Sequence, residues 1–190
     1  MKKIYIEVGA YSLHRTRDFL NEHKGEEWMV FLFEPNPLIL PFIKEEIKKS
    51  EFKNIVLYEV AAGSTNGTRK FYLGRRGASQ VAATLFEGKG YIDKNKFEEV
   101  QCIDFNQWFL DNVDKDAEIH MSMDIEGGEY EVLPAMIKSG AINYISSMDV
   151  EFHYRKFRGK NREIFNPIHK ELMEFFKNCK LKNVVLNGRL

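Results

Sequence analysis

The 190-residue sequence contains only two cysteines, Cys102 and Cys179, which lie far apart along the chain. Neither belongs to a Cys-x-x-Cys pair or to a Cys/His cluster, so the sequence predicts no zinc site of that kind and no redox motif. We expect both residues to be reduced thiols that pack like small apolar side chains.

Long hydrophobic runs are also lacking. The longest, residues 29–33 and 38–43, are far shorter than the roughly 20 residues that a helix needs to span a bilayer. The sequence begins Met1-Lys2-Lys3-Ile4 and enters a strand pattern at once, without the architecture of a signal peptide. These absences predict a cytoplasmic protein with no membrane span.

The chain has no excess of charge of either sign, because 28 Lys and Arg residues balance 28 Asp and Glu residues. A protein whose main work is to bind nucleic acid needs a basic surface that neutralises phosphates, so we expect no nucleic-acid partner. The 44% hydrophobic content is sufficient for a packed core. Length and composition together predict one domain over residues 1–190.

Short β-rich runs alternate with helical stretches, without repeats or a linker. Strands are predicted at residues 3–8, 28–33, 54–60, 119–125, 145–152 and 183–186. Helices are predicted at residues 16–23, 37–50, 104–112, 129–139 and 167–178. This alternation predicts an α/β fold with a mostly parallel central sheet and helices on both faces. Two extra strands, 68–73 and 98–103, flank a polar loop, 74–90, whose length is typical of functional or mobile loops.

Ligands of such sheets bind beyond the carboxyl ends of the strands, so the residues that follow each strand matter most. The first strand ends in the run Glu7-Val8-Gly9-Ala10-Tyr11-Ser12. Gly9 permits a sharp turn with the backbone close to a ligand. A carboxylate at Glu7, in an apolar strand, is costly unless a cationic ligand group or loop N–H groups satisfy it.

The second strand ends in Phe33-Glu34-Pro35-Asn36-Pro37. An acidic residue here is typical of nucleotide-binding folds, because a carboxylate accepts both hydroxyls of a ribose; the alternative is that Glu34 favours the start of the next helix. The turn after the first strand has one glycine, Gly9, and lacks the Gly-x-Gly-x-x-Gly pattern that holds a pyrophosphate. A ribose-bearing ligand with a cationic amino-acid end, S-adenosylmethionine, fits better.

Acidic pairs end two central strands. Asp124 and Glu126 lie at the end of one predicted strand, and Asp149, Glu151 and His153 lie at the end of the next. Alternation of side chains predicts that each set shares a face of its strand. Central parallel strands are normally apolar, so these acidic pairs predict an active site, with structural ion pairing as the alternative.

The chain resembles the FkbM family of methyltransferases over roughly residues 4–155. The resemblance rests on Glu7-Val8-Gly9-Ala10, Phe33-Glu34-Pro35-Asn36-Pro37, Ala61-Ala62-Gly63, Asp124-Ile125-Glu126-Gly127-Gly128-Glu129 and Glu151-Phe152-His153. It implies a Rossmann-like class I methyltransferase fold, S-adenosylmethionine as methyl donor with S-adenosylhomocysteine as product, and a hydroxyl oxygen of a sugar, glycan or related metabolite as acceptor. Glu7 and Leu13 stand where the family usually has Asp and Gly.

Roles carried over by position assign the donor site. Glu7 and the loop Gly9, Ala10, Tyr11 and Ser12 would hold the methionine part of the donor. Glu34, with Asn36 in the same loop, would hold the ribose, and Ala61 and Ala62 would flank the adenine. Asp124 would lie between donor and acceptor. The sequence leaves no obvious room for the last antiparallel strand of this fold, so we expect either a sheet that is one strand short or one that a neighbouring domain or subunit completes.

An acceptor hydroxyl must lose its proton as it attacks, which requires a general base. Asp124 and His153 are the candidates, with Glu151 or Asp149 orienting the imidazole; His153 could also be an ordinary strand-end histidine. A divalent metal on Asp124, Asp149, Glu151 and His153, with Glu126 beside them, is an alternative way to activate the hydroxyl. Acceptor contacts are predicted for Ser79, Gln80, Thr84, Glu126 and Arg155.

Two other functions remain open. A nucleotide-linked oxidoreductase is disfavoured by the missing glycine pattern. A catalytically inactive methyltransferase fold that serves as a binding module is disfavoured only by the acidic residues at the strand ends. A basic run begins at Arg155. It is either a solvated loop or a patch that binds an anionic acceptor.

Overall fold

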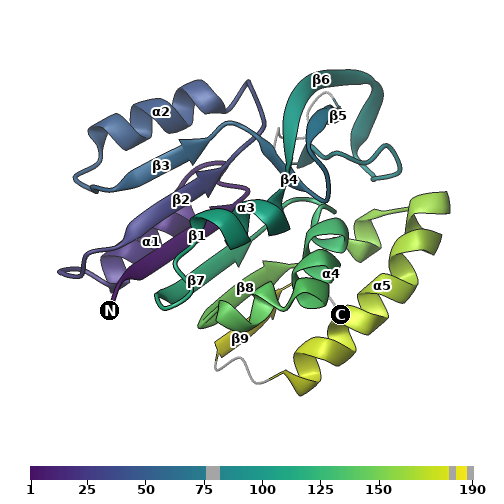
Figure 1. Ribbon diagram of the computed structural model, residues 1–190. Helices are drawn as coiled ribbons and strands as arrows, with labels where there is room; N and C mark the ends of the chain where they lie inside the picture. Colours follow the sequence, from purple (N-terminus) through teal and green to yellow (C-terminus); the bar gives the residue numbers. More distant parts are fainter. Residues whose placement is uncertain (76–81, 180–182, 188–190) are drawn as a thin grey trace.

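The computed structural model describes residues 1–75, 82–179 and 183–187. Its centre is a six-stranded sheet in the order β3-β2-β1-β7-β8-β9, in which every neighbouring pair is parallel (Figure 1). The strands are β1 (Lys3–Val8), β2 (Met29–Phe33), β3 (Ile55–Tyr58), β7 (Glu118–Met123), β8 (Ser147–Glu151) and β9 (Asn183–Asn187). The predicted α/β fold with a parallel sheet is confirmed.

Helices cover both faces of this sheet, as predicted. One face packs on α1 (His14–Glu22) and α2 (Leu40–Lys49) through a core that includes Tyr5, Trp28 and Leu32. The other face packs on α3 (Phe105–Asn112), α4 (Glu129–Ser139) and α5 (Gly159–Asn178). Alternating strand residues supply the two cores, because successive side chains of a strand point to opposite faces. No helix within the described ranges is long and apolar enough to cross a membrane.

Several predicted helix boundaries are wrong, each for a local reason. α1 begins two residues early, because Leu13 adopts a left-handed conformation (φ 58°) and acts as its N-cap. α2 begins at Leu40 rather than at residue 37, because the preceding residues form a turn in which Ile39 and Leu40 donate to the Asn36 carbonyl. α5 begins at Gly159 and continues through Pro167; its first half is anchored by the buried ring of Phe165.

A second, three-stranded sheet lies beyond the carboxyl ends of the main strands (Figure 1). It is made of β4 (Ala61–Gly63), β5 (Gly67–Gly74) and β6 (Ile92–Asp104), with β5 and β6 antiparallel. The two predicted extra strands are therefore confirmed, and β6 is longer than predicted. The third strand is shorter than the predicted range 54–60, because β3 ends at Tyr58 and Ala61 already belongs to the second sheet.

Two short 3-10 helices complete the described chain. The left-handed Gly140 (φ 81°) ends α4, as predicted, and also precedes the 3-10 helix η2 (Ala141–Tyr144). The second, η3 (Tyr154–Lys156), follows β8 directly. Every strand pair of the main sheet in the described residues is parallel; completion of the sheet by another domain or subunit stays a prediction.

Candidate active site

A pocket lies at the carboxyl ends of β1, β2 and β7, where β4 and β5 of the second sheet close it from the side; we call it the strand-end pocket. Most of the residues predicted for the donor site line it: Gly9, Tyr11, Ser12, Glu34, Asn36, Ala61, Ala62 and Asp124. Glu126, predicted as an acceptor contact, lines it too. Its apolar wall also contains Phe71, Ala83 and Leu85, which the sequence did not indicate. The loops after four separate strands thus meet in one cavity.

Gly9 lies where the ends of β1, β2 and β7 come together. It has φ +94°, and a Cβ at this position would lie 2.0 Å from the backbone oxygen of Asp124. The Asp124 N–H donates to the Val8 carbonyl at 2.9 Å, while the Gly9 N–H donates to Phe33 at the end of β2 at 2.9 Å. Only glycine permits this close approach, so Gly9 sets the spacing of the strand ends around the pocket.

Glu34 is buried at the end of β2 and ties two loops together. Its Oε2 accepts from the Tyr11 N–H at 3.0 Å, and its Oε1 accepts from the Asn36 N–H at 2.9 Å. Burial raises the pKa of this carboxyl despite these bonds. A carboxylate can accept about four hydrogen bonds, so the two oxygens retain acceptor capacity toward the pocket. Asn36 accepts from the Leu38 N–H at 3.1 Å and shapes the turn into α2.

Glu7 and Ala10 do not belong to the lining of this pocket. The Glu7 side chain lies on the α1 face of β1, almost fully buried, and its carboxyl accepts a short hydrogen bond from the Thr16 hydroxyl. Burial raises the pKa of Glu7 to about 8. The structure thus satisfies Glu7 through a helix hydroxyl, which was not among the partners considered from the sequence.

Arg15 of α1 is the main site residue that the sequence did not reveal. Its guanidinium binds Asp124 Oδ2, Glu151 Oε2 and Asp149 Oδ2, each at 3.2 Å. It also lies 3.4 Å from the Ser122 hydroxyl. One helix side chain therefore neutralises the acidic ends of β7 and β8, and it also lines the strand-end pocket.

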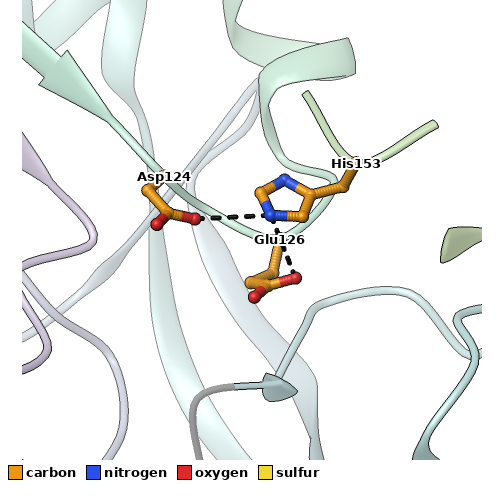
Figure 2. A group of neighbouring side chains, drawn as sticks. All are labelled: Asp124, Glu126 and His153. Carbon is orange, nitrogen blue, oxygen red and sulfur yellow. Dashed lines mark ion pairs between the residues drawn. The ribbon is translucent and has the colours of Figure 1, made fainter. Parts of the chain in front are cut away.

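His153 lies behind these acids, at the centre of a group of carboxylates that Figure 2 shows in part. Its Nε2 is 3.2 Å from Glu126 Oε2, 3.4 Å from Asp124 Oδ1 and 3.4 Å from Glu151 Oε1. The predicted alternation holds for Asp149 and Glu151, which both contact Arg15. It does not extend to His153, because β8 ends at Glu151 and the chain then turns. We call Asp124, Glu126, Glu151 and His153 the acid–histidine cluster.

Glu129, at the start of α4, holds the other side of the imidazole. Its Oε1 lies 3.2 Å from His153 Nδ1 and accepts from the His153 N–H at 2.8 Å. Burial alone would lower the pKa of the imidazole, but the surrounding carboxylates, Glu129 foremost, raise it to about 10. His153 is therefore an imidazolium at neutral pH.

The other members of the cluster titrate differently. Burial raises the pKa of Asp124 to about 6, against the opposing charges of His153 and Arg15. The neighbouring His153, with Lys156 and Arg15, lowers the pKa of Glu151 to about 2. Asp124 is thus the one of these two carboxylates that can exchange a proton near neutral pH.

Lys89 is a second unpredicted residue. It is buried, donates to the Ala82 carbonyl at 2.8 Å and makes a short contact with Glu126 Oε2. The hydroxyl of Thr84 donates to the Glu126 carbonyl at 2.6 Å. Glu126 is held at a positive φ of 53°. The segment after β5 therefore fixes Glu126, which a sequence pattern cannot indicate.

The predicted acceptor contacts are only partly brought together. Glu126 lines the strand-end pocket, whereas Thr84 is buried beneath it. Arg155 is exposed in η3, outside the pocket lining. Ser79 and Gln80 lie outside the described residues.

Comparisons with known proteins place the fold and the family of the chain. The fold is similar to the crystal structure of Methyltransferase FkbM from Methylobacillus flagellatus KT, with a TM-score of 0.52 and 12% identity over 92% of this chain and 37% of that chain. The chain therefore spans well under half of that protein's length, and the likeness shows the fold alone. No curated protein matches the sequence. Residues 7–182 match the family model described as the methyltransferase FkbM domain, and the chain therefore belongs to the FkbM methyltransferase family.

Proposed function

We propose that this chain is a single methyltransferase domain that binds S-adenosylmethionine in the strand-end pocket and methylates a hydroxyl oxygen of a sugar, glycan or related small metabolite. The observation that carries the proposal is the meeting of Glu34, Gly9 and Asp124 around one pocket at the ends of three parallel strands. A Rossmann-like sheet binds nucleosides at this place.

The chemistry of the pocket fits this donor. Glu34 retains acceptor capacity for the two ribose hydroxyls, and Ala61 and Ala62 offer a small, apolar surface for the adenine. The loop from Gly9 to Ser12 has no row of glycines to cradle a pyrophosphate, which favours a nucleoside without phosphates. Asp124 and Glu126 place negative charge where the donor's cationic end would lie.

The bound donor would supply an activated methyl group on its sulfonium. Asp124 would accept the proton that the acceptor hydroxyl loses as its oxygen bonds to the methyl carbon, while the methyl–sulfur bond breaks and S-adenosylhomocysteine leaves as the neutral thioether. The pKa of about 6 suits a general base that works near neutral pH. His153 fits this role less well, because an imidazole that already carries a proton cannot accept another. We assign to His153 and Glu151 the role of orienting Asp124 and adjusting its pKa through their charges.

The groups near Asp124 indicate the class of acceptor. Arg15 contacts Asp124, and Lys156 contacts the neighbouring carboxylates of Glu126 and Glu151, so charges of both signs lie in this region. A polyhydroxyl compound can bond with such mixed groups, whereas an extended nucleic acid needs a basic surface. Arg155, exposed in η3, would be the contact for an anionic group of the acceptor.

The test is calorimetric titration of S-adenosylmethionine and S-adenosylhomocysteine into the wild type, Glu34→Ala and the control Glu59→Ala. Glu59 is exposed and pairs with Lys44, so its loss should leave the pocket intact. We expect micromolar binding, weakened about 100-fold by Glu34→Ala because hydrogen bonds to a charged group are lost, and unchanged by Glu59→Ala. Absence of binding by the folded wild type, or binding of NADH instead, would refute the proposed donor.

Transfer is tested separately, with a methyl-labelled donor and a panel of sugars and glycans. Label on a hydroxyl of any panel member supports the proposed reaction. Tight donor binding with no transfer to any class of acceptor, and no slow donor turnover, would favour the inactive binding module.

A further inference from the structure

We propose that Asp124, Glu126 and His153 form a binding site for one divalent metal ion. Each offers one ligand atom, and these atoms lie within 4.8 Å of one another. His153 Nε2 is 3.4 Å from Asp124 Oδ1 and 3.2 Å from Glu126 Oε2 (Figure 2). Ligand atoms that share one ion at about 2.1 Å are about 3.0–3.4 Å apart, so the two distances from Nε2 already match those of a shared ion.

The imidazole gives the second, independent indication. Nε2 of His153 is buried and, within the described residues, makes no hydrogen bond; its contacts with the carboxylates, at 3.2–3.4 Å, are ion pairs only. A buried polar atom without a hydrogen-bond partner is costly, which makes it a candidate ligand atom.

Glu129 contacts the other ring nitrogen of His153, Nδ1. It accepts from both the backbone N–H and the Nδ1 side of His153, with no part of its side chain exposed. Histidines that bind metals usually donate their second ring N–H to a carboxylate, which fixes the ring and strengthens the ligand atom. The Glu129–His153 contact thus orients Nε2 as a metal site requires.

Three cations lie beside the proposed site, and they leave room for a further positive charge. Arg15 binds Asp124 through Oδ2 and leaves Oδ1 toward the imidazole. Lys89 and Lys156 contact Glu126 Oε2 and would compete for it. A metal ion at Nε2 takes the place of the imidazole proton. With that proton released to solvent, these three cations face four carboxylates (Asp124, Glu126, Glu129 and Glu151), so negative charge remains in excess.

The ligand set indicates the class of metal. Carboxylate oxygens suit Mg²⁺ and Mn²⁺, and imidazole suits the first-row transition metals, so Mn²⁺ accommodates both. The ion would border the strand-end pocket, because Asp124 and Glu126 line it. A hydroxyl bound to the ion would have a lower pKa. The site therefore goes beyond the proposed function, which requires no metal.

The experiment titrates Mn²⁺ into EDTA-treated, dialysed protein without methyl donor or acceptor, and follows free Mn²⁺ by its EPR signal. We expect one saturable site of micromolar affinity. Asp124→Asn and Glu126→Gln should each weaken binding at least tenfold, because each removes a charged ligand. Lys156→Ala, which removes a half-exposed competing cation, should tighten binding several-fold.

Controls separate the site from general effects. His120→Gln alters another histidine, whose Nε2 lies 3.2 Å from Glu118, far along the strand from the cluster, and should leave Mn²⁺ binding unchanged. Because replacement of the buried His153 can unfold the chain, the test rests on Asp124 and Glu126, whose variants are first checked by circular dichroism. Absence of saturable binding, or binding that both folded variants retain, would overturn the proposal. Neither outcome depends on whether the protein transfers methyl groups.

Discussion

Oε1 of Glu129 lies 3.2 Å from Nδ1 of His153, and neither side chain is exposed to solvent. This pair joins the start of α4 to the residue just past the end of β8. The pKa of the imidazole is raised to about 10, while that of Glu129 is lowered by the same interaction although burial opposes it. The contact therefore stabilises the fold as well as the site.

Glu129→Gln should lower the free energy of unfolding by about 3–5 kcal/mol at pH 7, because it leaves a buried imidazolium without its main counter-charge. Urea unfolding followed by circular dichroism measures this. The exposed Glu45→Gln serves as the control and should change stability by less than about 0.5 kcal/mol. Equal stability of Glu129→Gln and the wild type would show that the pair contributes nothing.

The wild-type protein should become less stable between about pH 6.5 and pH 10. His153 binds its proton more tightly in the folded state than its ordinary pKa of 6.5 allows, so the resulting stability is complete below pH 6.5 and is lost as the pH rises through about 10. Unfolding free energies measured at several pH values should follow this slope, and Glu129→Gln should flatten it. A stability that rises with pH over this window would contradict the assignment.

Glu7→Gln should stabilise the protein at pH 9 by a few kcal/mol and have little effect at pH 5. The pKa of Glu7 is raised to about 8, so the folded state prefers the neutral carboxyl and loses stability as the pH rises from about 4.5 through 8. Glutamine has a similar shape, stays neutral and can accept from Thr16. Chemical denaturation at both pH values tests this, with the exposed Glu22→Gln on α1 as control; a loss of stability at pH 9 would argue that the buried charge is needed.

Gly9→Ala should be far more damaging than Gly25→Ala, although both glycines have nearly the same φ, +94° and +93°. Each substitution has a similar cost in backbone strain, about 1 kcal/mol. Only at Gly9 does the new Cβ meet the Asp124 backbone, at 2.0 Å, whereas nothing lies within 4 Å at Gly25. We expect loss of S-adenosylhomocysteine binding and a clear drop in melting temperature for Gly9→Ala alone. Similar behaviour of the two variants would mean that strain, not the close approach, makes Gly9 necessary.

Methyl transfer should fall below about pH 6, where Asp124 becomes protonated, and Asp124→Asn should lower kcat about 10²–10⁴-fold. Arg15 holds down the pKa of Asp124, so Arg15→Met should move the acid limb of the pH–rate profile to higher pH. The exposed Arg17→Met, on the same helix, is the matched control and should leave the limb in place. An unchanged acid limb in Arg15→Met would mean that Asp124 is not the group whose protonation limits the rate.

The sequence predicted much of the site because strand ends carry local signals. Glu34 and Asp124 each stand directly after an apolar strand, and Gly9 marks a turn, so the topology of a parallel sheet brings them together without any knowledge of side-chain packing. Glu7 also lies near the end of an apolar strand, but its side chain faces α1 and not the pocket. The sequence pattern shows that strand side chains alternate, but it does not show which face α1 covers.

Arg15 and Lys89 show why other residues could not be found. Both are ordinary cations in their local sequence: Arg15 lies on a short amphipathic helix, and Lys89 lies in the polar segment after β5. Their contacts with Asp124 and Glu126 join positions 109 and 37 residues apart. No periodic pattern encodes a pairing at such separations, because it depends on how α1 and the second sheet pack against the main sheet.

The sequence by itself determined the order of strands and helices, the parallel sheet, and the edge of that sheet at which acidic residues gather. Apolar periodicity and turn residues act over a few neighbouring positions, so a linear pattern carries them. Only the tertiary structure decided which acidic residues pair with Arg15 and which of them surround His153. It also decided that Asp124 is the carboxyl with a pKa of about 6. Those properties depend on burial and on charges within a few ångströms, and residues distant in the chain supply both.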